Sequence, residues 1–208
     1  MIVMPSNNTG FEMGWLAGKY GQLGWLMGPG GWRYPKRGLP YALDNGAFTT
    51  WANGNPWDED AFVRLLESAR LAPYPPLWVI APDVVADRDA TIERWAQWRP
   101  ALRDYGWPLA FAVQDGMTQA DVPTDADVIF VGGSTEWKRD TVLQWCRDNP
   151  RVHVGRVNDY DFLRQCHEAG VESCDGTGWF RGDQAQLGGL ERYLEESKTG
   201  RLAQLSTV

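Results

Sequence analysis

Short apolar segments that end in polar or glycine residues recur along this chain of 208 residues and constrain its fold more than any other feature. Such segments are typical of strands, and here they do not alternate strictly between apolar and polar residues. Continuous apolar strands indicate a parallel sheet that is covered on both faces. The predicted strands are 2–4, 24–27, 41–43, 77–80, 109–113, 128–131, 153–157 and 171–174.

Helical patterns separate most of these strands. The predicted helices are a brief one that Asn8 or Thr9 caps, then 58–71, 88–105, 136–147, 160–169 and about 184–197. Eight strands that mostly alternate with helices predict an α/β fold, a compact (β/α)8 TIM-type barrel near the short end of that fold's size range. We expect one domain over residues 1–208, because the length is too small for two good cores. An open doubly wound sheet is the alternative.

The composition is that of an ordinary soluble globular protein, with 43% hydrophobic and 23% charged residues. No apolar run approaches the roughly 18 residues that a membrane span needs, and the N-terminus does not resemble a signal peptide. We therefore expect a cytoplasmic protein with no membrane partner. The three cysteines lack metal-ligand spacing, so neither a metal nor another cofactor is expected.

Polar or glycine residues follow most of the predicted strands. In barrels and open α/β sheets alike, sites form beyond the carboxyl ends of strands. An aspartate there often only caps the next helix, but so many marked ends in one chain favour a shared site. The last of them, Asp175, is followed by Gly176 and Gly178 and is expected to project into an open mouth. The marked ends are Asp44, Asp83, Gln114 with Asp115, Gly132 with Gly133, Arg156 with Asn158, and Asp175.

These residue types point to paired-carboxylate chemistry. One carboxylate can attack an anomeric carbon while a second one transfers a proton to or from the leaving group. A third carboxylate and an amide such as Gln114 complement the N–H donors and the O6 acceptor of guanine. Two adjacent glycines, Gly132 and Gly133, would let the backbone approach a flat ligand closely.

At these residues the sequence resembles a known family. Asp44-Asn45-Gly46-Ala47-Phe48 is similar to the Asp-Ser-Gly-Gly-Phe motif of tRNA-guanine transglycosylases. The resemblance spans about residues 41–178 and is closest to the DpdA-like enzymes of phages and bacteria, which exchange guanine in DNA for a 7-deazaguanine. The other motifs follow in the family's order: Pro82-Asp83, Val113-Gln114-Asp115-Gly116, Val131-Gly132-Gly133 and Ser173-Cys174-Asp175-Gly176-Thr177.

The resemblance implies a role for each matching residue. Asp175 would be the nucleophile that forms a covalent glycosyl intermediate, and Asp44 would be the general acid and base. Apart from the resemblance, Arg156 lies at a strand end and is expected to meet a phosphate or a carboxylate, although a structural ion pair is equally open. Asp87 is a rival to Asp83 because both follow the same strand. The set expected to bind the substrate is Asp83, Gln114, Gly132, Gly133, Asn45 and Arg156.

The resemblance also implies the partners. The tRNA enzymes carry a Cys/His zinc site near their C-terminus that this chain does not supply, so we expect DNA instead of tRNA, with a free 7-deazaguanine base as second substrate. Arg33, Lys36 and Arg37 lie in the one basic, aromatic loop and are expected to contact the nucleic-acid backbone, unless that loop is merely solvated. The net charge of −7 disfavours broad nucleic-acid affinity, so a partner protein that supplies DNA affinity is also expected.

Three other functions stay open. The same carboxylates would serve a hydrolase that cleaves the N-glycosidic bond of a nucleoside or DNA base, and the fold would also serve a noncatalytic purine-binding module. A phosphosugar enzyme could use Gly132-Gly133-Ser134 as a phosphate cradle, but it would need a catalytic Lys or His at a strand end, and the nearest candidate, Lys138, lies in the following helix. His153 and His167 are interpreted as structural.

Overall fold

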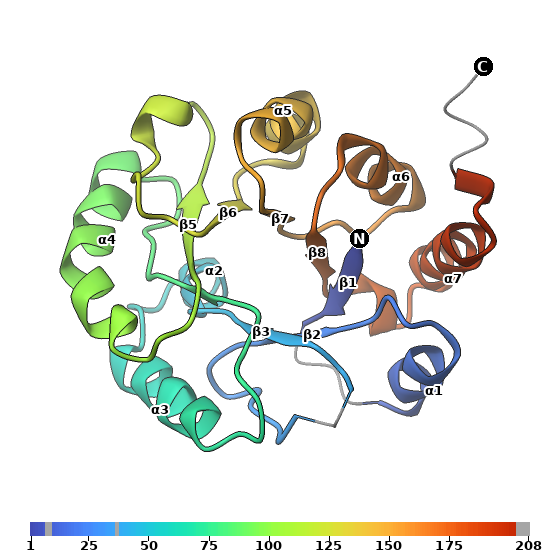
Figure 1. Cartoon of the computed structure of the whole chain (residues 1–208), viewed down its shortest axis with the longest axis horizontal. Coiled ribbons are helices and arrows are strands. Elements are labelled where there is room, and N and C mark those ends of the chain that lie inside the picture. Colours follow the sequence, from blue (N-terminus) through green and yellow to red (C-terminus); the bar gives the residue numbers. More distant parts are fainter. Residues whose placement is uncertain (7–9, 36–37, 203–208) are drawn as a thin grey trace.

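The computed structural model describes residues 1–6, 10–35 and 38–202. In this part of the chain eight parallel strands form one sheet in the order β1-β8-β7-β6-β5-β4-β3-β2. Isolated parallel bridges from Val3 to Leu23 and from Ser6 to Leu26 join the two outer strands, so the sheet rolls into a nearly closed barrel (Figure 1). The prediction of a (β/α)8 TIM-type barrel is confirmed, and the open doubly wound sheet is wrong.

The strands lie close to the predicted segments. Arg156 has a φ of +56°, in the left-handed region that ends an extended strand, which is why the seventh strand stops earlier than predicted. The last strand begins and ends two residues later than predicted and includes Asp175. The strands are β1 Ile2–Pro5, β2 Trp25–Met27, β3 Tyr41–Leu43, β4 Val79–Ile80, β5 Leu109–Val113, β6 Val128–Val131, β7 Val152–Val154 and β8 Ser173–Gly176.

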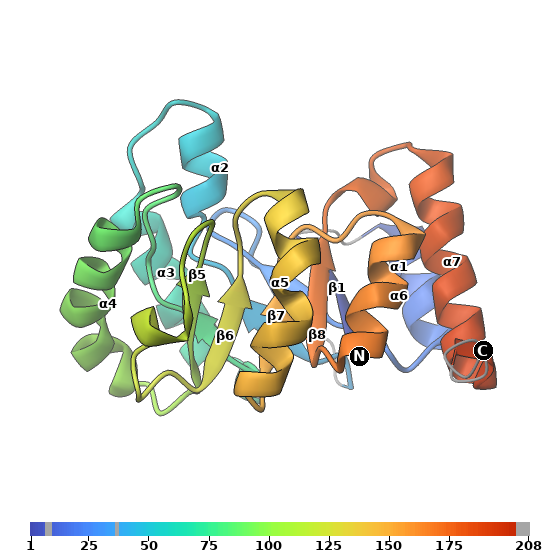
Figure 2. The ribbon, with the colours of Figure 1, turned by 90° about the horizontal axis from the view of Figure 1, so that it is seen from above.

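The helices include one that the sequence did not predict. This is α2, which rises above the carboxyl ends of the strands (Figure 2). The residue before it, Gly46, has the left-handed backbone conformation. The first helix begins after Gly10, which makes no side-chain cap, and the predicted caps Asn8 and Thr9 lie outside the described residues. The helices are α1 Phe11–Lys19, α2 Ala47–Ala52, α3 Glu59–Arg70, α4 Arg88–Arg103, α5 Thr135–Asp148, α6 Tyr160–Ala169 and α7 Gln184–Thr199.

Apolar side chains fill two layers of the barrel. The larger layer lies between the strands and the surrounding helices. The smaller one includes Met4, Leu26 and Trp78 and fills the barrel interior, where His153 stacks on Phe130 with ring centroids 4.8 Å apart. Because apolar side chains fill the barrel interior, the polar residues of the candidate site lie at the carboxyl ends of the strands. No helix in the described residues is long and apolar enough to cross a membrane.

Candidate active site

Asp175 is a buried carboxylate inside the barrel. It pairs in register with Met4 of the interior layer, whereas the adjacent Cys174 packs in the outer layer, as strand alternation predicts. Only 5% of Asp175 is exposed, so the expectation of an open, exposed aspartate is wrong: β8 extends past this residue and carries its side chain inward.

Two kinds of group stabilise the ionised form of Asp175. The main-chain N–H of Arg156 donates a hydrogen bond to its Oδ1, and the charges of Lys138 and Arg156 lie close by. Burial nevertheless dominates and raises the pKa of Asp175 to about 6. At neutral pH the buried carboxylate is therefore mostly ionised.

Asp44 follows β3 at the same end of the barrel. Its Oδ1 accepts a hydrogen bond of 3.3 Å from the main-chain N–H of Gly46. Burial raises the pKa of Asp44 to about 7, and repulsion from Asp175 is the next largest cause. The structure thus brings the predicted catalytic pair close enough to interact, with Asp44 the more readily protonated of the two.

Asn45 ties Asp83 to the loop that carries Asp44. Its Nδ2 donates to Ala81 O and to Asp83 Oδ1, both at 2.8 Å, and its Oδ1 accepts from Ala47 N at 2.8 Å. Burial raises the pKa of Asp83, although the Asn45 hydrogen bond opposes that rise. Because the amide of Asn45 is engaged within the protein, the structure gives it a positioning role, and direct contact with a substrate stays a prediction.

Gln114 is buried, and its side-chain amide is already hydrogen-bonded within the protein. It is 7% exposed, and its Oε1 accepts from Ala86 N at 2.6 Å while its Nε2 donates to Val84 O and Thr91 Oγ1. The side chain therefore holds the loop after β4. The rival of Asp83, Asp87, accepts from Ala90 N and caps α4, which leaves Asp83 as the carboxylate nearer the pair.

The turn at Gly132 and Gly133 is closed by a neighbouring carboxylate. Asp115 accepts hydrogen bonds from the N–H and the hydroxyl of Ser134. Burial alone would raise the pKa of Asp115, but the Ser134 hydrogen bonds outweigh it and lower the pKa. A phosphate cannot use the same Ser134 donors, so the phosphosugar alternative loses its cradle. The Gly133 carbonyl faces the mouth, where it accepts from the Arg156 guanidinium.

Arg156 spans the barrel mouth. Besides the bond to Gly133, its guanidinium lies over the ring of Phe48 in α2, 4.1 Å from the centroid. Arg156 thereby joins α2 to the loop after β6, and its guanidinium forms no salt bridge within the described part of the chain. Of the predicted nucleic-acid contacts, Arg33 is exposed and donates to Trp32 O, and Lys36 and Arg37 lie outside the described residues.

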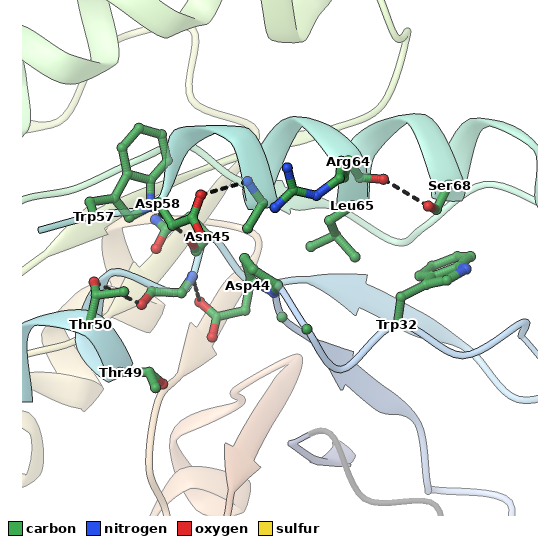
Figure 3. Close-up of a pocket in the computed structure, with 15 residues that line it drawn as sticks. Trp32, Asp44, Asn45, Thr49, Thr50, Trp57, Asp58, Arg64, Leu65 and Ser68 are labelled. Atoms are coloured by element: carbon green, nitrogen blue, oxygen red, sulfur yellow. Dashed lines mark hydrogen bonds between the residues drawn. The ribbon is translucent and has the colours of Figure 1, made fainter. Parts of the chain in front are cut away.

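A cavity of about 460 Å³ adjoins Asp44 on the side of α3 (Figure 3). Asp44 and Asn45 line it, but Asp175 does not. Trp32 stands opposite Arg64, Leu65 and Ser68 of α3. The other lining residues are Gly28, Pro29, Gly30, Gly46, Thr49, Thr50, Trp57, Asp58 and Ala61.

Sequence reasoning missed several of these residues. Arg64 and Ser68 lie on α3, whose apolar pattern identifies only the side that faces the core. Phe48 belongs to the Asp44 motif, but the motif itself assigns it no role. Lys138 was considered only for a different chemistry, yet it is fully buried and donates to Gly155 O at 2.5 Å. Among the described residues, no cluster of His, Cys, Asp and Glu could hold a metal ion.

Comparison with known proteins shows the fold alone. No protein family model matches the chain, and no curated protein does. A crystal structure of the BexX/CysO complex of Amycolatopsis orientalis is similar with a TM-score of 0.57 and 12% identity, covering 95% of this chain and 91% of that one. The native KDPGal structure is similar with a TM-score of 0.52 and 12% identity, covering 98% and 95%.

Proposed function

We propose that this protein is a base-exchange glycosyltransferase that replaces guanine in DNA with a 7-deazaguanine through a covalent bond between Asp175 and the sugar. The observation that carries the proposal is a pair of carboxylates at one end of the barrel in different environments: Asp175 is buried, and Asp44 is partly buried with its pKa raised by burial and in part by the charge of Asp175. Cations and an N–H group favour the ionised form of Asp175, as a nucleophile needs. Asp44 has the higher pKa, as a general acid needs.

The exchange takes two displacements. In the first, an Asp175 oxygen bonds to C1′, the bond from C1′ to N9 of guanine breaks, and Asp44 gives its proton to a ring nitrogen of the departing base. In the second, Asp44 takes the N9 proton of the 7-deazaguanine, N9 bonds to C1′, and the bond to Asp175 breaks. Asp44 ends protonated as it began, so atoms and charges balance without an oxidant or reductant.

The choice of guanine and of DNA comes from the ordered motifs that resemble the transglycosylases and their DpdA-like relatives. The structure adds a consistent support, since Asp44, Asp83 and Asp175 converge on one end of the barrel. A target base must leave the helical stack before C1′ can reach Asp175. We propose that the cavity beside Asp44 binds the DNA strand next to the target nucleotide, because the Trp32 ring can stack on a base and Arg64 can contact a phosphate.

The test is incubation of guanine-containing DNA, single- and double-stranded, with a labelled 7-deazaguanine base. The proposal predicts that label enters the DNA with the wild type and with Asp148→Asn, a control at the far end of α5. Asp175→Asn is expected to abolish incorporation. Abasic sites without label would indicate the hydrolase, and base binding without turnover that survives Asp175→Asn would indicate a purine-binding module; either result would overturn exchange.

A further inference from the structure

We infer that Lys138 is a positioning residue for the proposed nucleophile Asp175 and acts through the peptide group between Gly155 and Arg156. The ammonium of Lys138 holds the carbonyl of that peptide, and the N–H of the same peptide holds the carboxylate. The inference rests on the proposed function in giving Asp175 the role of nucleophile, but the contacts themselves do not depend on it.

The three groups are joined by two hydrogen bonds on one planar unit. Lys138 Nζ donates to Gly155 O at 2.5 Å, and Arg156 N donates to Asp175 Oδ1. The carbonyl and the N–H of a trans peptide point in opposite directions, so a cation at the oxygen and an anion at the nitrogen both lie along its dipole. Hydrogen bonds in such a chain strengthen one another in a low-dielectric interior.

The backbone at this turn is held in an uncommon conformation. Arg156 has a φ of +56°, which a residue with a side chain adopts when its surroundings fix it. Gly155 packs so tightly that an added Cβ would lie 2.9 Å from the Phe130 ring. Val157 N donates to the Asp175 carbonyl at 2.6 Å, so both the main chain and the side chain of Asp175 bind this turn. Through its hydrogen bond to Gly155 O, Lys138 connects this turn to α5.

The charges around Lys138 explain how a fully buried lysine is tolerated. Burial lowers its pKa to about 8, the positive Arg156 adds to this, and Asp175, Cys166 and Asp115 oppose it. The neighbouring His153 is uncharged, because burial, with help from Lys138, lowers its pKa to about 3. Lys138 is therefore charged at neutral pH and able to polarise the peptide.

The groups that face Asp175 come from four other places. Arg156 and Lys138 favour its ionised form, as does a hydrogen bond from the Ser6 side chain. Repulsion from Asp175 in turn adds to burial in raising the pKa of Asp44, and the Cys174 thiol, which packs in the outer layer on the other side of β8, is kept protonated by burial, which raises its pKa. Removing the Lys138 charge should therefore move the Asp175 titration upward, whereas a lysine that only filled space would leave it in place.

The experiment is a ¹³C NMR titration of the side-chain carboxyl of Asp175, identified by its loss in Asp175→Asn. We expect a midpoint near 6 in the wild type and a rise of about 1 pH unit in Lys138→Met, in line with the effect of one nearby charge. The control is Lys198→Met, since Lys198 also donates to a main-chain carbonyl, Lys19 O at 3.2 Å, but on the surface. An unchanged midpoint in folded Lys138→Met would overturn the inference.

A second measurement needs no variant and applies even if Lys138→Met does not fold. In the wild type the amide resonance of Arg156 should respond to pH in two steps, near 6 with Asp175 and near 8 with Lys138. Absence of the upper step contradicts the link through the peptide. Both readouts are independent of turnover, so a shifted titration in a protein without exchange activity would refute the proposed function and support the positioning role.

Discussion

The rate of base exchange should depend on pH as a bell with its maximum near 6.5. The productive form of the pair has Asp175 ionised and Asp44 protonated. Burial raises the pKa of Asp175 to about 6 and that of Asp44 to about 7, and repulsion between the two adds to the Asp44 shift. The rising limb therefore reports the nucleophile and the falling limb reports the acid.

The size of the effect follows from these two values. At pH 6.5 each carboxyl group is in its productive form in roughly three quarters of the molecules, so about 0.58 of the protein has both. At pH 5 or at pH 8 one of the two groups is productive in only about 0.09 of the molecules. The rate should therefore fall about sixfold on either side of the maximum.

The assay is the initial rate of label incorporation at low DNA concentration, measured from pH 5 to 8.5 at constant ionic strength, since DNA binding depends on salt. In Asp44→Asn we expect a rate lower by about 10²–10⁴, with the falling limb lost and the rise near pH 6 kept. A wild-type rate that continues to rise to pH 8.5 would refute the assigned roles. So would a falling limb that survives in Asp44→Asn.

Three further outcomes are expected. Both carboxyl pKa values are raised on folding, so protonation of Asp44 and Asp175 stabilises the fold at low pH, and this stabilisation is lost as the pH rises from about 4 to 7. In urea unfolding, Asp44→Asn should therefore raise the free energy of unfolding by roughly 2–4 kcal/mol at pH 8 and change it little at pH 4. Asp175→Asn should show the same pH dependence with a smaller gain. Gly155→Ala should destabilise by about 1–3 kcal/mol, because the added Cβ meets the Phe130 ring at 2.9 Å, and an unchanged unfolding midpoint would contradict the packing. Arg33→Ala should weaken DNA binding at low salt and reduce the slope of log affinity against log salt by about 1, and an equal slope would remove Arg33 from the interface.

The fold was predictable because its signal is repeated. Each strand is a short apolar run, and eight such runs separated by helical patterns leave few architectures. The unpredicted helix α2 has only six residues, too short for a helical period to stand out, and it begins at a left-handed glycine, Gly46. The early end of β7 depends on the φ of Arg156, which no sequence pattern specifies.

The candidate site was predictable only in part. Strand ends located Asp44 and Asp175 at one end of the barrel, but their burial depends on how far β8 extends and on the loops around it. Gln114 matched a motif, yet its amide is used by the loop after β4, because hydrogen-bond partners distant in the chain decide where an amide points. Nothing in the sequence indicates that Lys138 is linked to Asp175, because the link runs through the Gly155–Arg156 peptide group in the loop after β7.

The central claim is that Asp175 becomes covalently bound to a DNA sugar. Its most direct test is intact-protein mass spectrometry after the wild type is mixed with a guanine-containing oligonucleotide, with or without excess free base, and is then quenched with denaturant. The account predicts a protein–DNA adduct that maps to Asp175 and disappears when excess guanine or 7-deazaguanine is supplied. An adduct that persists in Asp175→Asn, or guanine release by the folded wild type without any adduct, would contradict it.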